Sequence, residues 1–213
     1  MDNKELNFTT WNKVAQLYQD NFMDLKQYNE SYKFFCDQIS DRKAKILDIG
    51  CGPGNISKYL IINKPDLQII GIDFSPNMIE LARTNIPQSR LEVLDCREVL
   101  RINQIFNGII CGFCIPYLSK EDLEKFISDC YSLLLPKGMA YFSYIEGEYT
   151  HSKIETGRSG DTCIVYYYHK SYFDQLLKHN GFEIIGSFQL QYTNSENEKS
   201  VQQITISYKI ETT

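Results

Sequence analysis

Residues 46–55 read ILDIGCGPGN, a short apolar run that leads straight into a glycine-rich turn. Lys45–Gly50 has the length and composition of a buried strand, and Asn55–Ile62 follows with helical periodicity. Glycines at 50, 52 and 54 remove Cβ atoms where the backbone must bend sharply and come close to a ligand. Free N–H groups at the start of the helix would face that ligand. The stretch therefore predicts a strand–turn–helix unit with a binding site at the turn.

Short apolar runs alternate with longer periodic segments on the C-terminal side of this unit, which is typical of βαβ units and a parallel sheet. The expected strands are Lys45–Gly50, Leu67–Asp73, Arg90–Leu94, Gly108–Phe113 and Met139–Tyr144. The expected helices are Asn55–Ile62, Pro76–Asn85, Glu98–Arg101 and Lys120–Leu135, the last begun by Ser119 and ended by the turn at 136–138. We therefore expect an α/β fold with a doubly wound, three-layer architecture.

The two ends of the chain have patterns of their own. Aromatic and aliphatic residues recur at helical spacing from Thr10 to Ser40, which predicts two helices with Thr9 and Thr10 as caps of the first. Gly147–Gly160 has no period and is expected to be an irregular insertion that acts as a lid. The remaining expectations are a short strand at Tyr166–Tyr168, a helix from the cap Ser171 to Asn180, and a hairpin of Phe182–Tyr192 with Val201–Ile210.

These patterns predict a single domain of 213 residues. Its parts would be an N-terminal helical cap at 1–43, a core at 44–144, a lid at 145–170, and a C-terminal helix and hairpin at 171–213. Hydrophobic residues make up 43% and charged residues 23%, as in a globular protein. The start of the chain lacks a secretory signal and no segment has the apolar length of a membrane span, so we expect a cytoplasmic protein.

Charge and cysteine content exclude several classes of function. The net charge of −5 and the isoelectric point near 5.3 argue against a nucleic-acid-binding protein, which needs clustered Lys and Arg. The seven cysteines are an odd number scattered through apolar segments, as expected of reduced thiols. Cys111 and Cys114 have CxxC spacing, but alternation along a strand would send them to opposite faces, so we expect neither a redox motif nor a metal site.

Asp73 ends the second expected strand, 23 residues after Gly50. An open α/β sheet places a carboxylate at this point, where it accepts hydrogen bonds from two ribose hydroxyls. The alternative is an aspartate that only ends a strand, which is common. Coupling to the glycine turn favours a nucleoside-binding role for Asp73.

Together these motifs resemble the Rossmann-like (class I) methyltransferases that use S-adenosylmethionine, in particular the small-molecule branch that includes ubiquinone and menaquinone methyltransferases. The E/DxGxGxG motif matches Asp48, Gly50, Gly52 and Gly54, and residues 71–82 (GIDFSPNMIELA) are similar to the second motif. Residues 106–113 resemble the fourth motif, and residues 133–138 (LLLPKG) resemble the LkPGG turn. The resemblance covers about 45–144 and implies a seven-stranded, mostly parallel sheet with an antiparallel last strand.

The resemblance also implies where the cofactor would bind. Asp73 would hold the ribose, Phe74 and Met78 would flank the adenine, and Asp95 with Cys96 would read its amino edge. Trp11 and Tyr18 in the leading helices could cover the sulfonium with aromatic faces, because this branch often folds its N-terminal helices over the cofactor; ordinary core packing is the alternative. The expected cofactor-binding residues are therefore Trp11, Tyr18, Asp48, Gly50, Cys51, Gly52, Asp73, Phe74, Met78, Asp95, Cys96 and Cys111.

The acceptor side carries fewer signals. Methyltransferases that act on exocyclic amines of DNA bases or on glutamine use an Asn-Pro-Pro-Tyr type motif after the fourth strand, and residues 112–117 (GFCIPY) have no Asn or Asp there. Tyr117 is a candidate for the acceptor pocket. His151 and His169 are candidates for a general base near neutral pH, although loop histidines are usually inert. A dedicated base is optional because holding the reactants together supplies much of the rate.

Three hypotheses follow. The first is transfer of a methyl group from S-adenosylmethionine to an O, N or C atom of a small molecule, by a monomer or homodimer that binds neither nucleic acid nor membrane. The second is a protein that binds S-adenosylmethionine or S-adenosylhomocysteine without catalysing transfer. The third is an NAD- or FAD-dependent oxidoreductase, whose GxGxxG fingerprint would need a glycine where Asn55 stands.

Overall fold

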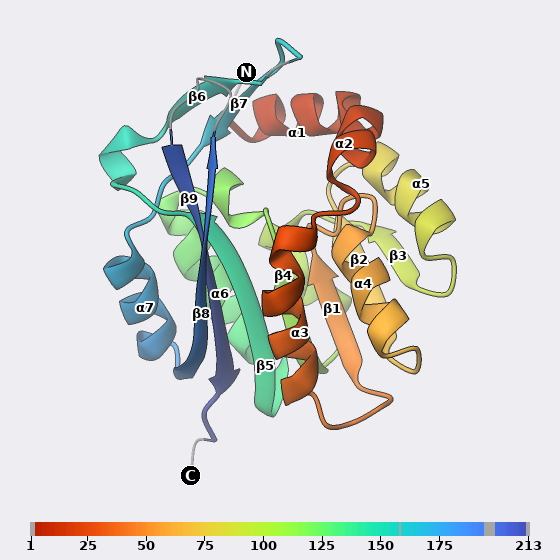
Figure 1. Ribbon diagram of the computed structural model, residues 1–213. Helices are drawn as coiled ribbons and strands as arrows, with labels where there is room; N and C mark the ends of the chain where they lie inside the picture. Colours follow the sequence, from red (N-terminus) through yellow and green to blue (C-terminus); the bar gives the residue numbers. More distant parts are fainter. Residues whose placement is uncertain (1–2, 158, 194–198, 212–213) are drawn as a thin grey trace.

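A seven-stranded sheet with the order β3-β2-β1-β4-β5-β9-β8 runs through the molecule (Figure 1). The computed structural model describes residues 3–157, 159–193 and 199–211. The strands are β1 Lys45–Ile49, β2 Gln68–Asp73, β3 Arg90–Val93, β4 Phe106–Cys111, β5 Leu134–Ile145, β8 Phe182–Thr193 and β9 Lys199–Lys209. The first five are parallel, and β9 runs antiparallel to both of its neighbours. The expected mostly parallel sheet with an antiparallel last strand is confirmed.

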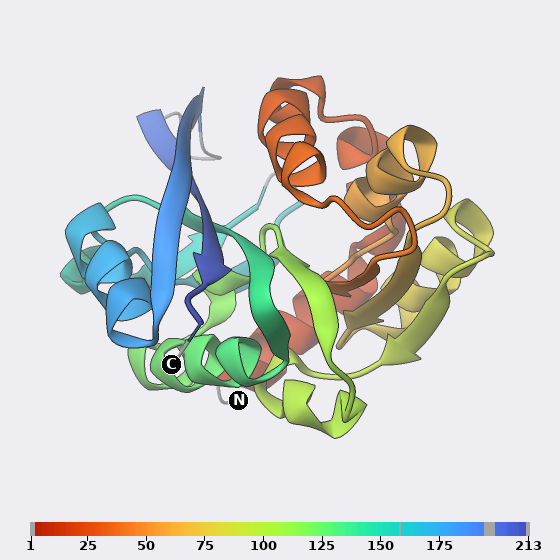
Figure 2. The ribbon, with the colours of Figure 1, turned by 90° about the horizontal axis from the view of Figure 1, so that it is seen from below.

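Helices cover both faces of the sheet (Figure 2). On one face lie α3 (Asn29–Gln38) and α4 (Asn55–Asn63), whose apolar side chains share a buried cluster with the sheet. On the other face, a second cluster joins the sheet to α6 (Lys120–Ser132), α7 (Lys170–His179) and the 3₁₀ segment η2 (Cys96–Ile102). The crossover helix α5 (Pro76–Asn85), between β2 and β3, contacts both of these strands. The doubly wound, three-layer fold is thereby confirmed.

The order of the strands reverses between β1 and β4, because β2 and β3 lie on one side of β1 while β4 and β5 follow on the other. Crossovers therefore diverge here, and the loops at the carboxyl ends of β1 and β4 separate. Ligands of open α/β sheets bind in the crevice at such a switch point. The glycine-rich turn begins at the end of β1, directly at this position.

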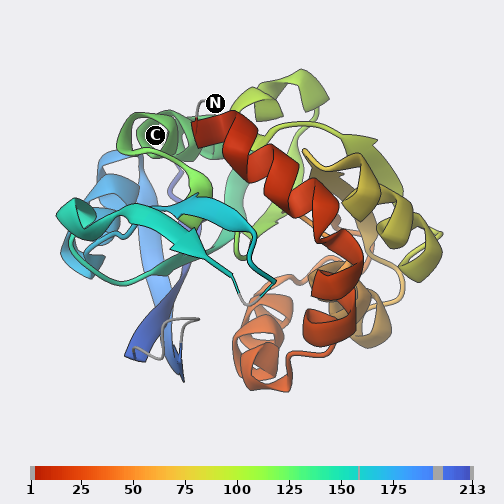
Figure 3. The same ribbon diagram turned by 90° about the horizontal axis from the view of Figure 1, so that it is seen from above.

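The N-terminal helices cross the carboxyl ends of the parallel strands (Figure 3). They are α1 (Asn3–Lys13), α2 (Ala15–Phe22) and the 3₁₀ turn η1 (Lys26–Tyr28), followed by α3. The predicted caps Thr9 and Thr10 are wrong, since both residues lie inside α1. Tertiary contacts explain the earlier start: the polar face of α1 bonds to a strand edge, with the Asn7 side chain accepting from Ile164 N at 2.8 Å.

The segment expected to be an irregular insertion contains a small hairpin instead. It consists of a 3₁₀ turn η4 (Tyr149–His151) and the antiparallel pair β6 (Lys153–Thr156) and β7 (Thr162–Val165). The expected strand at Tyr166–Tyr168 is wrong. The strand β7 ends before it, at Val165, and Tyr168 forms only an isolated parallel bridge with Glu146. The hairpin packs against α1, where Ile164 N bonds to the Asn7 side chain, and this contact joins distant parts of the chain.

Two further boundaries differ from the expectation. Helix α6 ends at Ser132, and β5 already begins at Leu134 and continues through the 136–138 turn, where Lys137 has φ 59°. Helix α7 begins at Lys170, capped by His169 rather than by Ser171, because the imidazole Nδ1 accepts from Ser171 N at 3.3 Å. The C-terminal hairpin is confirmed as β8 and β9, while residues 194–198 of its connection lie outside the described residues.

Across the described ranges, no helix combines the length and apolarity needed to cross a membrane. All seven cysteines are free thiols, as expected, and five of them are buried.

The core beneath α7 offers a test of this packing. The Phe173 side chain is fully buried and stacks on Tyr144 with ring centroids 4.2 Å apart. We expect Phe173→Ala to lower the free energy of unfolding by about 3 to 5 kcal/mol, because it leaves a cavity in the core. Phe22→Ala, at a side chain that is 44% exposed, is the matched control and should cost under about 1 kcal/mol. Urea denaturation measures both, and equal losses would contradict the packing described.

Candidate functional site

The Asp73 carboxylate connects two loops at the carboxyl edge of the sheet. Its Oδ2 accepts a hydrogen bond from the backbone N–H of Gly52 at 2.9 Å, and its Oδ1 accepts one from Ser75 N at 2.9 Å. The side chain is buried, and burial raises the pKa of this carboxyl to about 6, although both N–H donors lower it. Each carboxylate oxygen accepts one bond and has room for another. Asp73 is thus held in place with acceptor capacity to spare.

The glycine-rich turn needs its glycines for backbone conformation and for space. Gly50, Gly52 and Gly54 all have positive φ, at 66°, 54° and 88°. A Cβ atom on Gly50 would lie 2.9 Å from the Cβ of Cys114, and one on Gly54 would lie 2.9 Å from Cδ1 of Ile86. Side chains at these positions would strain the backbone and clash. The turn therefore presents bare backbone toward the switch point.

Asp48 lies beneath the turn and is fully buried. Its Oδ2 accepts a hydrogen bond from the Ser57 hydroxyl at 2.6 Å, and its Oδ1 has no protein partner among the described residues. Burial raises the pKa of this carboxyl to about 7, and the nearby Asp73 also raises it, while Ser57 lowers it. Ser57 is in the first turn of α4, so the bond ties the helix start to β1.

A cavity of about 90 Å³ lies above the turn. It brings together ten of the residues expected at the site, namely Trp11, Tyr18, Gly50, Gly52, Asp73, Phe74, Met78, Asp95, Cys96 and Tyr117. Asp48, Cys51 and Cys111 are not among the lining residues and are buried below it. The predicted cofactor residues thus divide into a group that faces the cavity and a group that supports it.

Aromatic rings roof the cavity. Trp11 lies between Tyr18 and Tyr117, with ring centroids 5.7 Å and 5.1 Å away. Nearby, Tyr28 meets Phe113 edge to face at 5.0 Å. Aromatic faces attract cations because of their quadrupole. The rings that could have been ordinary core packing are instead exposed to the cavity.

Polar side chains fasten this roof to the loop after β2. Asn12 Oδ1 accepts hydrogen bonds from the Ser75 hydroxyl at 2.9 Å and from Asn77 N at 3.1 Å. The Asn77 side-chain amide donates to Asn12 O at 2.7 Å. Because Ser75 is also the N-cap of α5 and donates its N–H to Asp73, the N-terminal helices and the Asp73 carboxylate share one hydrogen-bond network.

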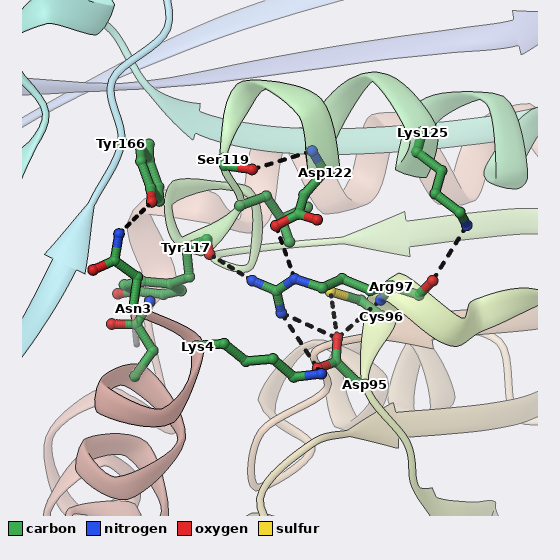
Figure 4. Close-up of polar contacts among 12 residues, drawn as sticks. Asn3, Lys4, Asp95, Cys96, Arg97, Tyr117, Ser119, Asp122, Lys125 and Tyr166 are labelled. Atoms are coloured by element: carbon green, nitrogen blue, oxygen red, sulfur yellow. Dashed lines mark hydrogen bonds and ion pairs between the residues drawn. The ribbon is translucent and has the colours of Figure 1, made fainter. Parts of the chain in front are cut away.

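Arg97 neutralises the carboxylates at the far end of the cavity (Figure 4). Its guanidinium donates to Asp95 Oδ1 at 3.1 Å, to Asp122 Oδ2 at 2.9 Å and to Tyr117 O at 3.2 Å. Lys4 adds an ion pair to Asp95 at 3.1 Å. Burial raises the pKa of Asp95, but Arg97 and Lys4 outweigh it and hold the pKa below its ordinary value. All three guanidinium nitrogens of Arg97 therefore donate hydrogen bonds.

The prediction that Cys111 and Cys114 point apart is wrong. Phe113 has φ 67° and donates its N–H to the Ser143 hydroxyl at 3.0 Å, so the chain leaves the strand direction after Cys111. The Cys114 thiol comes within 3.6 Å of the Cys96 sulfur, and the neighbouring Cys111 thiol raises the pKa of Cys114. Within the described ranges, no group of three or more acidic, His or Cys side chains is arranged to hold a metal.

The two candidate histidines lie outside the cavity lining. His151 is exposed on η4, and His169 is exposed and occupied as the cap of α7, where its ring also pairs with the Ser171 hydroxyl at 2.7 Å. Tyr117 does line the cavity, and burial raises the pKa of its hydroxyl well above the ordinary value. The candidate base role therefore has no support from the placement of either histidine.

Several site residues were missed from the sequence. Asn7, Arg97, Phe113, Cys114 and Leu118 line the cavity, and Asn12 holds its roof. Arg97 had a local signal, because it follows Asp95 by two residues and donates its N–H to that side chain at 2.9 Å. Asn7 and Asn12 had none, since their partners are more than 60 positions away.

The comparisons with known proteins agree with this site. Residues 46–138 match the family profile described as "Methyltransferase domain", and this range holds the turn, Asp73 and Asp95. Over this range, which is less than half of the chain, the protein is similar to the methyltransferase domain. Among curated relatives, malonyl-[acyl-carrier protein] O-methyltransferase of Acetivibrio thermocellus is 29% identical over 150 residues, which are 70% of this chain and 48% of that protein.

A second curated relative is the ubiquinone biosynthesis O-methyltransferase of Coxiella burnetii. It is 28% identical to this chain over 53% of this chain and 48% of that protein. The chain spans less than half the length of the first curated relatives it matches. A solved structure, the magnesium protoporphyrin IX methyltransferase of Synechocystis with bound S-adenosylmethionine, superposes with a TM-score of 0.71 at 17% identity, covering 98% of each chain. That likeness shows the shared fold.

Asp48 makes the stability of the protein depend on pH. Its folded-state pKa of about 7 exceeds the unfolded value, so its contribution to stability is present below about pH 4 and is lost as the pH rises through 7. Asp48→Asn removes the buried charge. We expect the variant to be more stable than the original protein at pH 8 by roughly 2 to 4 kcal/mol, with a smaller gain at pH 5.

Urea unfolding at the two pH values checks this, with Asp66→Asn at a half-exposed carboxylate as the control. The gain in stability of Asp48→Asn over the original protein should be larger at pH 8 than at pH 5. A smaller gain at pH 8 would contradict a raised pKa for the buried Asp48 carboxyl.

Proposed function

We propose that this protein transfers the methyl group of S-adenosylmethionine to a small molecule. The observation that carries the proposal is the pairing of the bare glycine turn with Asp73, whose carboxylate is fixed by the N–H groups of Gly52 and Ser75. The match of residues 46–138 to the methyltransferase domain supports the same cofactor, as do the similar structures that hold S-adenosylmethionine or S-adenosylhomocysteine. These relatives, several of which act on small molecules, support the choice of acceptor class.

The residues of the cavity fit the parts of this cofactor. Asp73 would accept hydrogen bonds from the two ribose hydroxyls, because each of its oxygens still has acceptor capacity. Phe74 and Met78 would flank the adenine, and Asp95 with Cys96 would lie at its edge. The methionine part would run along Gly50 and Gly52, above the buried Asp48 and Cys51 and toward Cys111 at the end of β4.

S-adenosylmethionine supplies an activated methyl group on a sulfonium, so the chain itself needs mainly to bind and orient. Trp11 and Tyr18 would face the positive sulfur with aromatic rings, an interaction worth about 0.5 to 2 kcal/mol. The roof also keeps bulk water away from the reacting atoms. Alignment of the two reactants can supply effective molarities of about 10⁵ to 10⁸ M without a dedicated base.

In this proposal the acceptor would bind between the N-terminal helices, Tyr117 and the β6–β7 hairpin. Tyr166 N donates to Pro116 O at 2.7 Å, which holds the end of the hairpin against the Ile115–Tyr117 turn. In this proposal residues 3–211 act as one unit, with α1 and α2 as the cap of the cofactor and the hairpin as the wall of the acceptor site. The placement of both histidines outside the cavity supports transfer without a histidine base.

A second candidate is binding of the cofactor without transfer. The observation that favours it is that neither histidine lines the cavity and that burial holds the pKa of Tyr117 far above neutral pH, so none of the three candidate bases is poised to remove a proton. The dinucleotide alternative has less support, because Asn55 replaces the third glycine and β9 runs antiparallel.

The donor site is tested by titration with S-adenosylhomocysteine. We expect saturable binding to the original protein, and about 10- to 100-fold weaker binding to Asp73→Ala, because two hydrogen bonds to a charged group are lost. Asp66→Ala, at a half-exposed carboxylate just before the start of β2, should bind normally. Isothermal calorimetry measures the affinities, and the absence of binding at millimolar ligand would reject the proposal.

Binding should also depend on pH through Asp73. Its pKa of about 6 means that the Asp73 carboxylate becomes protonated, and loses capacity to accept hydrogen bonds, as the pH falls through 6. We expect affinity for S-adenosylhomocysteine to be constant above about pH 7 and to fall by up to about tenfold per pH unit below 6. Asp73→Asn should bind weakly at all pH values with a flat profile. A steep profile in that variant would assign the titration to another group.

Transfer and binding alone are separated by product formation. The protein is incubated with methyl-labelled cofactor and a small-molecule extract, and labelled products are separated by chromatography. We expect saturable product that disappears with Asp73→Ala and persists with Asp66→Ala. No product from a protein that binds S-adenosylhomocysteine normally would favour the binding-only candidate.

A further inference from the structure

Two thiols meet in the lining of the cavity, and their sulfur atoms have no chemical role in the proposed function. The Cys114 sulfur lies 3.6 Å from the Cys96 sulfur, and both residues line the cavity. The third thiol of this region, Cys111, is fully buried and is not among the lining residues. Cys96 and Cys114 are therefore the two thiols that a small molecule in the cavity can reach.

The segments that carry the two thiols are already held together. Cys96 begins η2, and Cys114 directly precedes the 3₁₀ turn η3 (Ile115–Tyr117). Arg97, the residue after Cys96, donates a hydrogen bond to Tyr117 O at 3.2 Å and so joins η2 to η3 (Figure 4). The sulfur contact is thus supported by the fold on both sides.

The thiol pair also connects two parts of the cavity wall. A Cβ atom on Gly50 would lie 3.3 Å from the Cys114 sulfur, so this thiol packs against the glycine turn. The Cys96 sulfur is 3.7 Å from Asp95 Oδ1, at the far end of the cavity. A chain of contacts therefore runs from the glycine turn through both thiols to Asp95.

We propose that Cys96 and Cys114 form a modification site, at which a hydroperoxide joins the two sulfurs in a reversible disulfide that narrows the cavity. Cys114 is the more exposed, so its thiolate attacks the peroxide. An S–O bond forms and the O–O bond breaks, which gives a sulfenic acid and releases water or an alcohol. The Cys96 thiolate then attacks that sulfur, an S–S bond forms and water leaves. Two thiols are oxidised, one peroxide is reduced, and both thiol protons end on the released oxygens.

The disulfide changes the shape of the cavity. The two sulfurs must approach from 3.6 Å to about 2.05 Å. Because Cys114 packs on Gly50 and Cys96 adjoins Asp95, this approach draws the two walls together. The cavity measures about 90 Å³, so a small approach removes space that a ligand needs. The identity of that ligand rests on the proposed function, whereas formation of the disulfide does not.

Peptide mapping detects the disulfide directly. The protein is treated with hydrogen peroxide at about pH 8.5, because the contact with Cys114 and burial raise the pKa of the Cys96 thiol and leave little thiolate at pH 7. Trypsin then separates the two thiols, since Cys96 falls in residues 91–97 and Cys114 in residues 102–120. We expect these two peptides to be linked, and dithiothreitol to separate them. Free thiols are blocked with iodoacetamide before digestion to prevent exchange.

Cysteine variants assign the link to one pair of sulfurs. Cys114→Ser should abolish the link, whereas Cys111→Ser, which removes the other thiol of the same peptide, should preserve it. Fragment-ion masses of the linked peptides make the same distinction in the original protein. Cys163→Ser, at a half-buried thiol of β7, is the matched control and should form the link at the same rate. Circular dichroism shows whether each variant is folded.

The affinity for S-adenosylhomocysteine measures the consequence of the link. The ligand is titrated by calorimetry into the reduced protein, the peroxide-treated protein and the treated protein after dithiothreitol. We expect about tenfold weaker binding after oxidation and recovery after reduction. Cys114→Ser should bind equally before and after peroxide, which separates the disulfide from other oxidation of the protein.

The inference is overturned if the two peptides do not link, if the link persists in Cys114→Ser, or if the disulfide form binds S-adenosylhomocysteine as tightly as the reduced form. A reduced protein that binds no S-adenosylhomocysteine would reject the proposed donor site instead. The peptide map would then decide the modification site alone.

Discussion

The Asp73 carboxylate is the contact on which the rest of the site depends. It joins the glycine turn after β1 to the start of α5 after β2 by accepting one backbone N–H from each. Without a buried acceptor at this point, two loops from neighbouring strands would each contain an unsatisfied N–H group, which costs about 1 to 3 kcal/mol per group. The same oxygens face the cavity, so one side chain stabilises the loops and offers a binding site.

From Asp73 the network continues into the N-terminal helices. Ser75 bonds to Asn12, and the residue before Asn12 is Trp11, the aromatic centre of the roof. The loop after β2, the N-terminal helices and the β6–β7 hairpin are therefore connected, because α1 also bonds to β7 through Asn7. A ligand that moves the roof would act on both sides of the cavity. This coupling is physical, since each step is a hydrogen bond between described groups.

Charge is distributed unevenly around the cavity. At the Asp95 end of the cavity, Arg97 and Lys4 compensate Asp95, and Arg97 also compensates Asp122. At the turn, Asp73 and Asp48 are buried with raised pKa values and no cationic partner among the described residues. On the hairpin, Glu155 is bonded to a neutral hydroxyl. A positively charged ligand would be favoured at the turn, where Asp48 and Asp73 lack a cationic partner among the described residues.

Local patterns in the sequence were sufficient to predict the core of the fold, the glycine turn and the position of Asp73 at the end of β2. Residues 45–145 alternate strands and helices whose periodicity is visible over a few residues, and the glycines at 50, 52 and 54 are needed for local backbone reasons. Asp73 could be placed because strand ends converge at one edge of a parallel sheet. The placement of these residues agreed with the structure, apart from shifts of a few residues at α6 and β5.

Tertiary structure alone decided the parts that depend on distant partners. The early start of α1, the β6–β7 hairpin and the cap at His169 all arise from contacts or side-chain geometry that no periodicity encodes. The left-handed backbone at Phe113 brought Cys114 to Cys96 and reversed the expectation for the CxxC pair. Sequence by itself determined which segments form the sheet and the glycine turn, because those depend on neighbouring residues. Folding decided which side chains share the acceptor region, because that depends on how distant segments meet.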